Sequence, residues 1–280
     1  MLELAAALAK LLVYAGTLVG AGTALAWAVL RDVPGNLASE ARRRTVRGAI
    51  VAAASAIAAI AILIARLGSG LDPSLVGAAL SGSTGPAFAS QIAGAALLAA
   101  AAAGAARRPL RLMGAALLLA SFGVTGHAAA SGAAEGFLAA VHVAAAAWWL
   151  GSLLLVRSAC GTLDAQALAE FVRRFGRAAL FVVGAMVAAG AVVAAALLSP
   201  WRHGWFTPYA RNLFLKIVLA GAALALAAYN RIRLAPLLLD TGGPAAGRLR
   251  RSVTAELTFL GAVLLATAWL TTFHSPHETH

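Results

Sequence analysis

The chain has 280 residues, of which 61% are hydrophobic and 11% are charged, and its formal net charge is +12. Soluble domains carry about 25% charged residues, so this composition excludes an ordinary soluble domain. The basic residues stand between apolar runs rather than in one patch, which argues against a nucleic-acid partner and is typical of anchors in anionic membrane lipids. The single cysteine excludes an internal disulfide and a multi-cysteine metal site.

Eight apolar runs approach the roughly 20 residues that a helix needs to cross a bilayer. They cover residues 4–30, 46–67, 87–106, 109–129, 135–157, 172–198, 211–231 and 252–273. Backbone groups in lipid must be satisfied internally, and the alternation of a barrel strand is absent, so the runs predict helices. The expected fold is an all-α polytopic membrane protein with eight transmembrane helices. The gaps leave no room for a soluble domain, and the first run lacks the basic start of a cleavable signal.

The lysines and arginines set the expected orientation, because cytoplasmic loops are enriched in them. One side collects 17 of the 22 basic residues, namely Arg31, Arg42, Arg43, Arg44, Arg47, Arg107, Arg108, Arg111, Arg157, Arg173, Arg174, Arg177, Arg231, Arg233, Arg248, Arg250 and Arg251. The other side has Lys10, Arg66, Arg202, Arg211 and Lys216. The split predicts that both termini face outward, to the periplasm or the cell exterior.

All six histidines then fall on or near the periplasmic face, and imidazole is the commonest protein metal ligand. His127 ends the fourth predicted span, and His142 lies in the fifth, on one stripe with Glu135 and Trp149 because seven residues complete nearly two helical turns. The short connection makes these two helices antiparallel neighbours. The pair is a candidate metal site; the alternative is that each histidine simply bonds a neighbouring helix.

Two further groups of residues could take part. The tail from residue 274 to 280 holds His274, His277 and His280, and flexible His-rich tracts can bind divalent metals. Polar residues within spans usually face the bundle interior, and here these are Lys216, Asn230, Arg231 and Glu256. Lys216 could instead extend to the interface, and Glu256 could pin its helix to Asn230 or Arg231.

The segments 207–216, 228–236 and 248–257 resemble the copper resistance protein D (CopD) family of bacterial inner-membrane proteins. So do Thr125-Gly126-His127, His142 with Trp148-Trp149-Leu150-Gly151, and residues 171–177. The resemblance covers residues 110–273 as a core, whereas residues 1–108 match only as hydrophobic helices. We expect the whole chain to form a single transmembrane helical domain, with residues 274–280 as a His-rich external tail. It implies eight spans, copper movement across the membrane and a periplasmic copper carrier of the CopC type as partner. Its motifs fall on His127, His142, Lys216, Asn230, Arg231 and Glu256.

These observations favour copper uptake over two alternatives. Copper would be received at the outer face by His127 and His142, with the tail from His274 to His280 as a site of first capture. It would then pass toward Met186, Met113 and the cytoplasm, with Trp149 beside the path, although lone methionines are more often core filler. Nothing resembles a nucleotide-binding motif, so transport is expected not to be powered by an ATPase of this chain. The chain is expected to be a transport protein and not an enzyme. The alternatives are a non-transporting copper-delivery factor for oxidase assembly, and a b-type protein with one haem ligated by His127 and His142.

Overall fold

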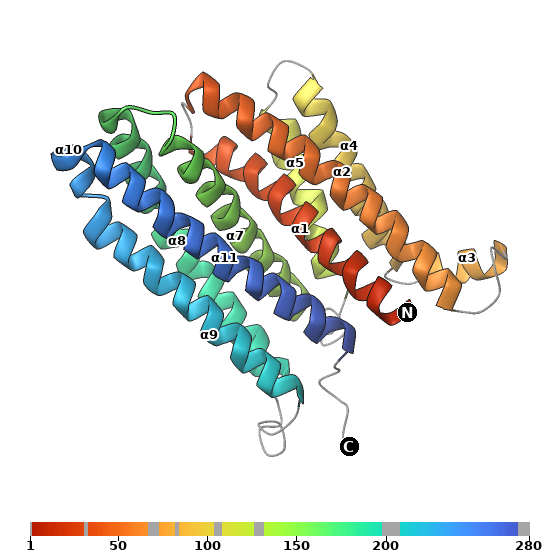
Figure 1. Cartoon of the computed structure of the whole chain (residues 1–280). Helices are drawn as coiled ribbons and strands as arrows, with labels where there is room; N and C mark the ends of the chain where they lie inside the picture. The colour runs from red at the N-terminus through yellow and green to blue at the C-terminus, as the bar shows by residue number, and fades with distance from the viewer. Residues whose placement is uncertain are drawn as a thin grey trace.

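A computed structural model describes residues 2–30, 33–66, 73–81, 84–103, 108–125, 132–197 and 208–273, and every element assigned within these ranges is a helix. The elements are α1 (Leu2–Val29), α2 (Gly35–Arg66), α3 (Pro73–Leu80), α4 (Thr84–Ala103), α5 (Arg108–Ala120), the 3₁₀ turn η1 (Ser121–Gly123), α7 (Ala133–Ala159), α8 (Ala165–Leu197), α9 (Pro208–Tyr229), the π-helical turn η2 (Asn230–Leu234), α10 (Leu237–Thr241) and α11 (Gly243–Phe273). The long helices run alongside one another as a bundle (Figure 1).

Seven of the described helices are long and apolar enough to cross a membrane, namely α1, α2, α4, α7, α8, α9 continued by η2, and α11. The prediction of an all-α polytopic membrane protein is therefore confirmed. The eighth span is represented by α5, which has 13 residues before the 3₁₀ turn begins at Ser121. The rest of that predicted span, residues 126–129, lies outside the described residues, so the count of eight stays a prediction.

Several helices begin before the apolar runs that predicted them. α2 starts at Gly35 rather than residue 46, α8 at Ala165 rather than 172, and α11 at Gly243 rather than 252. Hydropathy marks only the part of a helix that lies in hydrocarbon, whereas charged turns can extend the same helix beyond it. Glu40 illustrates this at the start of α2, where it pairs with Arg43 and Arg44 at helical spacing.

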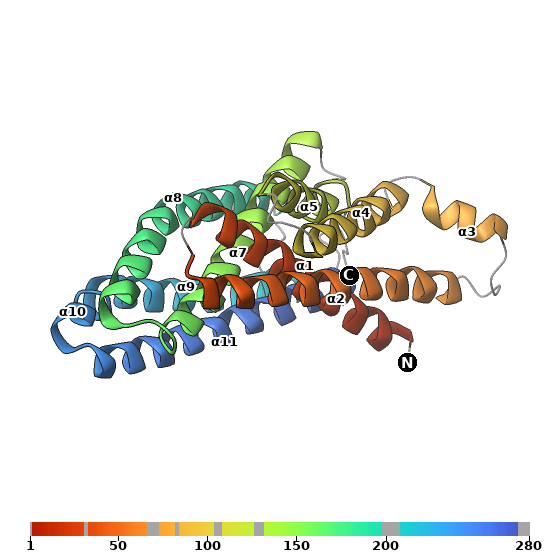
Figure 2. The same ribbon diagram turned by 90° about the horizontal axis from the view of Figure 1, so that it is seen from above.

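The bundle has two groups of helices. The N-terminal group is α1, α2, α4 and α5, and the C-terminal group is α7, α8, α9 and α11. α1 and α7 lie in the middle and pack against each other, and α11 also contacts both (Figures 1 and 2). The short helix α3 projects from the edge of the N-terminal group (Figure 2).

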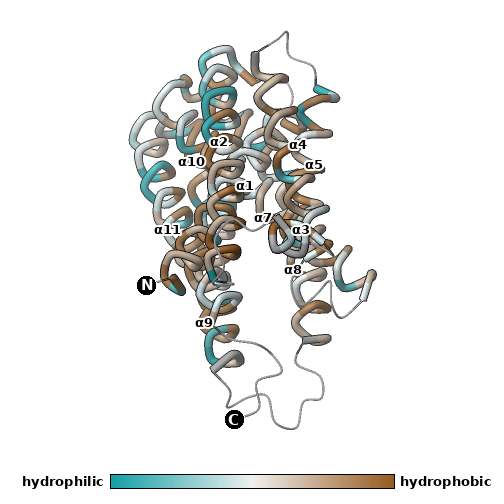
Figure 3. Tube along the Cα trace, turned by 90° about the vertical axis from the view of Figure 1, so that its right-hand side faces the viewer, coloured by the Kyte–Doolittle hydropathy of each residue, from teal (hydrophilic) through white to brown (hydrophobic). Residues whose placement is uncertain are grey.

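Side chains from distant parts of the sequence define the two ends of the bundle. At one end, called here the arginine-rich end, Arg44 of α2 donates to the Leu154 carbonyl at 2.6 Å and to the Ser158 hydroxyl at 2.8 Å. Hydrophilic residues gather there on α2, α10 and α11, and apolar residues dominate the middle (Figure 3). At the opposite end, Lys10 of α1 donates to the carbonyl of Thr271 in α11 at 2.7 Å. The start of α1 and the end of α11 therefore lie together, as the charge pattern predicted.

Glycines let the helices of the N-terminal group approach at backbone distance. A Cβ atom added at Gly16 would lie 2.5 Å from the backbone nitrogen of Ala52 in α2, and one at Gly94 would lie 2.7 Å from that of Leu118 in α5. The crossing of α1 with α7 is equally close at Gly22 and Gly151. Small residues at crossing points are the usual means by which helices pack in lipid.

Candidate functional site

His142 lies within α7, where it faces α8. Its Nδ1 atom is 2.8 Å from the carbonyl oxygen of Met186. A Cβ atom added at Gly190 of α8 would lie 2.7 Å from this same Nδ1, so the ring occupies space that only glycine leaves open. The imidazole is thus held in one orientation by two residues of the neighbouring helix.

The contact with Met186 also determines which ring nitrogen is available to a ligand. A carbonyl oxygen can only accept a hydrogen bond, so Nδ1 of the neutral ring must carry the proton. Nε2 then has a lone pair and makes no hydrogen bond among the described residues. Histidines that bind metals are commonly held in this way, with the other ring nitrogen donating to a backbone carbonyl.

Lys216 is the charged group that α9 brings toward His142. It lies within electrostatic range of the imidazole, and the described residues include no ion pair for its ammonium group. Lys216 is half-buried on α9. The sequence placed these residues on separate helices and did not predict that they approach one another.

Deeper in the same group, Glu256 forms a buried polar contact with Asn230. Glu256 of α11 is 1% exposed, and its Oε2 accepts a hydrogen bond of 3.0 Å from the side-chain amide of Asn230. Trp149 of α7 presents its indole to the same carboxyl group. Even so, Glu256 Oε1 and Asn230 Oδ1 have no hydrogen-bond partner of normal geometry.

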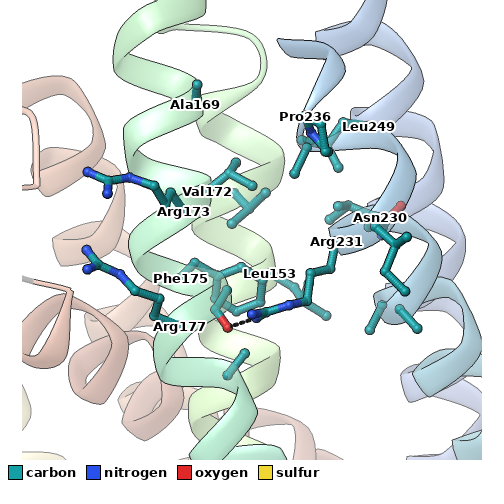
Figure 4. A pocket seen from close by; sticks show the side chains of 18 of the residues that line it. Leu153, Ala169, Val172, Arg173, Phe175, Arg177, Asn230, Arg231, Pro236 and Leu249 are labelled. Atoms are coloured by element: carbon teal, nitrogen blue, oxygen red, sulfur yellow. Dashed lines mark hydrogen bonds between the residues drawn. The ribbon is translucent and has the colours of Figure 1, made fainter. Parts of the chain in front are cut away.

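Arg231 does not join this contact, although it follows Asn230 directly. Its guanidinium group reaches across to α8 and donates to the carbonyl of Gly176 (Figure 4). The expected link between Glu256 and the end of α9 is therefore found with Asn230 and is a hydrogen bond rather than an ion pair. The π-helical turn that begins at Asn230 accounts for this, because Asn230 is buried while Arg231 is exposed.

A cleft of about 1220 Å³ opens beside this polar contact, at the arginine-rich end. α8 packs against α7 and α9 packs against α11, but α8 and α9 form no packing interface with each other. The cleft lies between them, with Trp149 and Leu153 of α7 and Glu256 of α11 in its lining. Figure 4 shows Arg231 directed across the cleft, whereas Arg173 and Arg177 point away from it.

His142, Trp149 and the Asn230–Glu256 pair form what we call the polar column. Residues 142 and 149 are two turns apart on α7, or about 10 Å along its axis. Trp149 is 1% exposed, and its neighbour Trp148 stacks on Phe175 with ring centroids 5.9 Å apart, so both tryptophans are packed in the core. The column runs from the middle of the C-terminal group to the cleft at the arginine-rich end.

Other predicted site residues do not join the column. Met113 is 50% exposed on α5, in the N-terminal group, whereas Met186 is buried beside His142. Glu135 folds back over the start of its own helix, since a Cβ atom on Gly132 would lie 2.5 Å from Oε2 of Glu135. The structure therefore does not connect the two methionines as a ladder, and it separates Glu135 from His142.

Four of the predicted histidines, His127, His274, His277 and His280, lie outside the described residues. Within the described ranges, no three side chains of His, Cys, Asp or Glu gather as a ready-made metal site. Sequence reasoning missed Gly190, which makes room for the His142 ring, and the carbonyl of Gly176, which accepts from Arg231. A glycine beside a histidine on another helix leaves no signal in the sequence of either helix.

Two protein-family models match the chain. The model of the copper resistance protein D family matches residues 169–270, and the model of the copper resistance protein D-like N-terminal domain matches residues 1–137. A search of the curated proteins and of the solved structures finds no match. The model of the N-terminal domain covers the N-terminal group of helices and the start of α7. The model of the copper resistance protein D family covers α8 to α11, and this stretch includes Lys216, Asn230, Arg231 and Glu256. The chain is a membrane-embedded, multi-pass member of the copper resistance protein D family, with a role in copper resistance.

Proposed function

We propose that the protein carries copper across the bacterial inner membrane into the cell, and that His142 receives the ion together with His127. The observation that carries this proposal is the contact of His142 Nδ1 with the Met186 carbonyl, because it leaves Nε2 free to bind a metal. Imidazole suits copper among the transition metals. Copper is the cargo on this proposal, and the protein performs no chemistry on it.

The described chain before His127 packs against α7, the helix that carries His142. A Cβ atom added at Gly123 of η1 would lie 3.0 Å from the carbonyl oxygen of Gly136 and 3.2 Å from the Cβ atom of Ala140. Two residues turn a helix through about 200°, so η1 lies near the height of His142 along α7 but against a different face of the helix.

The arrangement of charge supports the orientation of the protein on which this proposal depends. The arginine-rich end is the cytoplasmic one by the positive-inside rule, so the start of α1 and the end of α11 face the periplasm. His274, His277 and His280 follow α11 on that face and would capture copper from a periplasmic carrier of the CopC type. The cleft at the arginine-rich end, beyond Trp149 and Glu256, would release it.

Copper measurements on His142→Ala and His127→Ala, alone and together, test the proposal in the full-length protein. The control is His203→Ala, which removes a histidine that the proposal does not use. We expect the double variant to lose copper accumulation in cells and about one equivalent of bound copper after purification, while the control keeps both. Unchanged uptake by a well-expressed double variant would contradict the proposal.

Transport in liposomes separates uptake from copper delivery without transport. Purified protein should move external copper into vesicles, and His142→Ala/His127→Ala should not. Copper that binds at these histidines but never enters the vesicles would favour an assembly factor instead. A Soret absorption band in the wild type that disappears in His142→Ala/His127→Ala would show instead that these histidines bind haem.

A further inference from the structure

The carboxyl group of Glu256 is buried without a counter-charge. It is 1% exposed, and no described arginine, lysine or histidine forms an ion pair with it. Only neutral donors face it: the amide of Asn230 donates to Oε2, the indole of Trp149 is presented to the carboxyl group, and Oε1 has no hydrogen-bond partner of normal geometry. An ionised carboxylate in such surroundings is poorly stabilised, whereas a bound proton removes the charge.

The charged groups on the surrounding helices are engaged elsewhere. On the α9 side, Arg231 donates to the Gly176 carbonyl. On α8, Glu170 pairs with Arg173 and Arg174, and Figure 4 shows Arg173 and Arg177 pointing away from the cleft. On α7, the nearest charged residue toward the arginine-rich end is Arg157, which donates to Thr254 at 3.0 Å.

On α11 itself, three arginines precede Glu256, and they are Arg248, Arg250 and Arg251. Arg251 is the nearest of these along the helix and is exposed, as is Arg250. Residue 251 lies five positions before Glu256, or about 7.5 Å along the helix axis. Among the residues that the structure describes, no arginine, lysine or histidine therefore forms an ion pair with the carboxyl group of Glu256.

The cleft lies against the carboxyl group on its arginine-rich side. Glu256 and Asn230 both contribute to its lining, and its 1220 Å³ exceed many times the roughly 30 Å³ of one water molecule. In the other direction the column holds packed side chains, among them Trp149 at 1%, Met186 at 6% and Leu260 at 9% exposure. Open volume therefore adjoins Glu256 toward the arginine-rich end, and packed side chains adjoin it toward the opposite end.

We propose that Glu256 is a proton-binding site that holds a proton in the resting protein and exchanges it with the arginine-rich side through the cleft as copper passes. The coupling to copper rests on the transport function proposed above. When the cation arrives in the inner half of the column, the O–H bond of the carboxyl group breaks, the proton leaves to water in the cleft, and the carboxylate balances one positive charge. When the cation leaves, the carboxylate takes a proton back from the same water.

Infrared spectroscopy of the purified protein in lipid tests the proton site without any need for transport. A protonated carboxyl group gives a carbonyl stretching band that is absent from a carboxylate. We expect this band in the wild type and in Glu135→Gln, the matched control, and its loss in Glu256→Gln. The glutamine keeps the size and the hydrogen bonding of the protonated acid, so this variant should fold. The proposal would be overturned if the wild type at neutral pH lacked this band, or if Glu256→Gln left the band unchanged.

Coupling is tested in liposomes by changing the pH on the arginine-rich side. The proton leaves to that side and returns from it, so no net proton crosses the membrane, but copper movement by the wild type should slow as the pH there falls. Glu256→Gln should lose this pH dependence while it keeps equilibrium copper binding at His142. Copper movement by the wild type that does not depend on the pH of the arginine-rich side would overturn the coupling. If the wild type moves no copper at all, the transport function fails, but the infrared result still decides whether Glu256 holds a proton.

Discussion

The helices of the N-terminal group pack closely, whereas two helices of the C-terminal group stand apart. In the N-terminal group, helices meet at glycines with backbone against backbone, as at Gly16 with Ala52 and at Gly94 with Leu118. In the C-terminal group, α8 and α9 do not pack together, and a cleft of about 1220 Å³ separates them. The polar column lies beside this cleft.

The difference teaches where stability and chemistry reside in this fold. Close contact at small residues gives van der Waals attraction, which is the main force between helices in lipid. Buried polar groups with unsatisfied oxygens, such as those of Asn230 and Glu256, work against stability and mark functional positions. We therefore regard the N-terminal group as the scaffold and the C-terminal group, which includes α7 with His142, as the candidate site.

The largest expected effect comes from a methyl group at the junction of the two groups. Gly151→Ala would place its Cβ atom on the backbone of Gly22 and Thr23, so α1 and α7 must move apart. Overpacking of this kind costs about 3 kcal/mol when the backbone cannot yield. The measurement is the free energy of unfolding, or the melting temperature, of the protein in detergent.

The matched control for that change is Gly221→Ala in α9, where an added Cβ atom meets nothing within 4 Å. This variant should be as stable as the wild type or slightly more so, because alanine favours a helix by about 1 kcal/mol over glycine. Equal stability of Gly151→Ala and Gly221→Ala would remove the distinction between scaffold and site.

The second effect concerns the site alone. Gly190→Ala should push the His142 ring off the Met186 carbonyl, because the new methyl group would lie 2.7 Å from Nδ1. Loss of such a supporting contact typically lowers metal affinity 10- to 100-fold. We expect a fall of at least about tenfold in copper affinity by titration calorimetry, with a small change in melting temperature.

The same helix offers a control for this variant. Gly184→Ala adds its methyl group where nothing lies within 4 Å, so it should keep the copper affinity of the wild type. If Gly190→Ala and Gly184→Ala bound copper equally well, the contact of His142 with α8 would not contribute to copper affinity.

A smaller effect is expected from the hydrogen bond between Asn230 and Glu256. Hydrogen bonds between transmembrane helices contribute about 0.6 kcal/mol on average and up to about 1.7 kcal/mol. Asn230→Leu should cost an amount in this range, since it leaves the buried carboxyl group without its donor. Adding Glu256→Leu to it should cost less than the sum of the two single changes, because no buried partner is then left unsatisfied. Strictly additive melting data would show that the two groups do not interact.

Much of the fold follows from the apolar runs, because the length of a hydrophobic run fixes where a helix can cross a bilayer. The contact between Glu256 and the end of α9 was also predictable, since α9 and α11 are sequential helices whose ends must lie close together. The approach of His142 to Gly190 was not, because the pattern within a single helix does not determine which other helix it faces.

The cleft and the π-helical turn were equally hidden from the sequence. The cleft exists because α8 and α9 each pack against another helix, which is a property of the whole bundle. The π-helical turn at Asn230–Leu234 precedes Pro236, whose missing N–H removes a regular helical hydrogen bond. Proline at that place predicts an irregular turn but does not specify which side chain it turns inward.

The smallest effect concerns the edge of the C-terminal group, where the single cysteine follows α7. Partial burial raises the pKa of the Cys160 thiol to about 11, and Arg250 nearby opposes this shift. The folded protein thus holds the thiol proton more tightly than the unfolded chain, so this thiol makes the fold less stable as the pH rises from about 9 toward about 11.

Alkylation of Cys160 measures that burial directly. Only the thiolate reacts, so the rate of maleimide labelling should rise about tenfold per pH unit between about pH 7 and pH 10, where an ordinary thiol would already level off. Arg250→Gln should slow the labelling at every pH, because it removes the cation that favours the thiolate. Arg231→Gln lies across the cleft and should leave the rate unchanged. A rate that levels off near pH 9 in the wild type would mean that the Cys160 thiol is not buried and that the end of α7 is open to water.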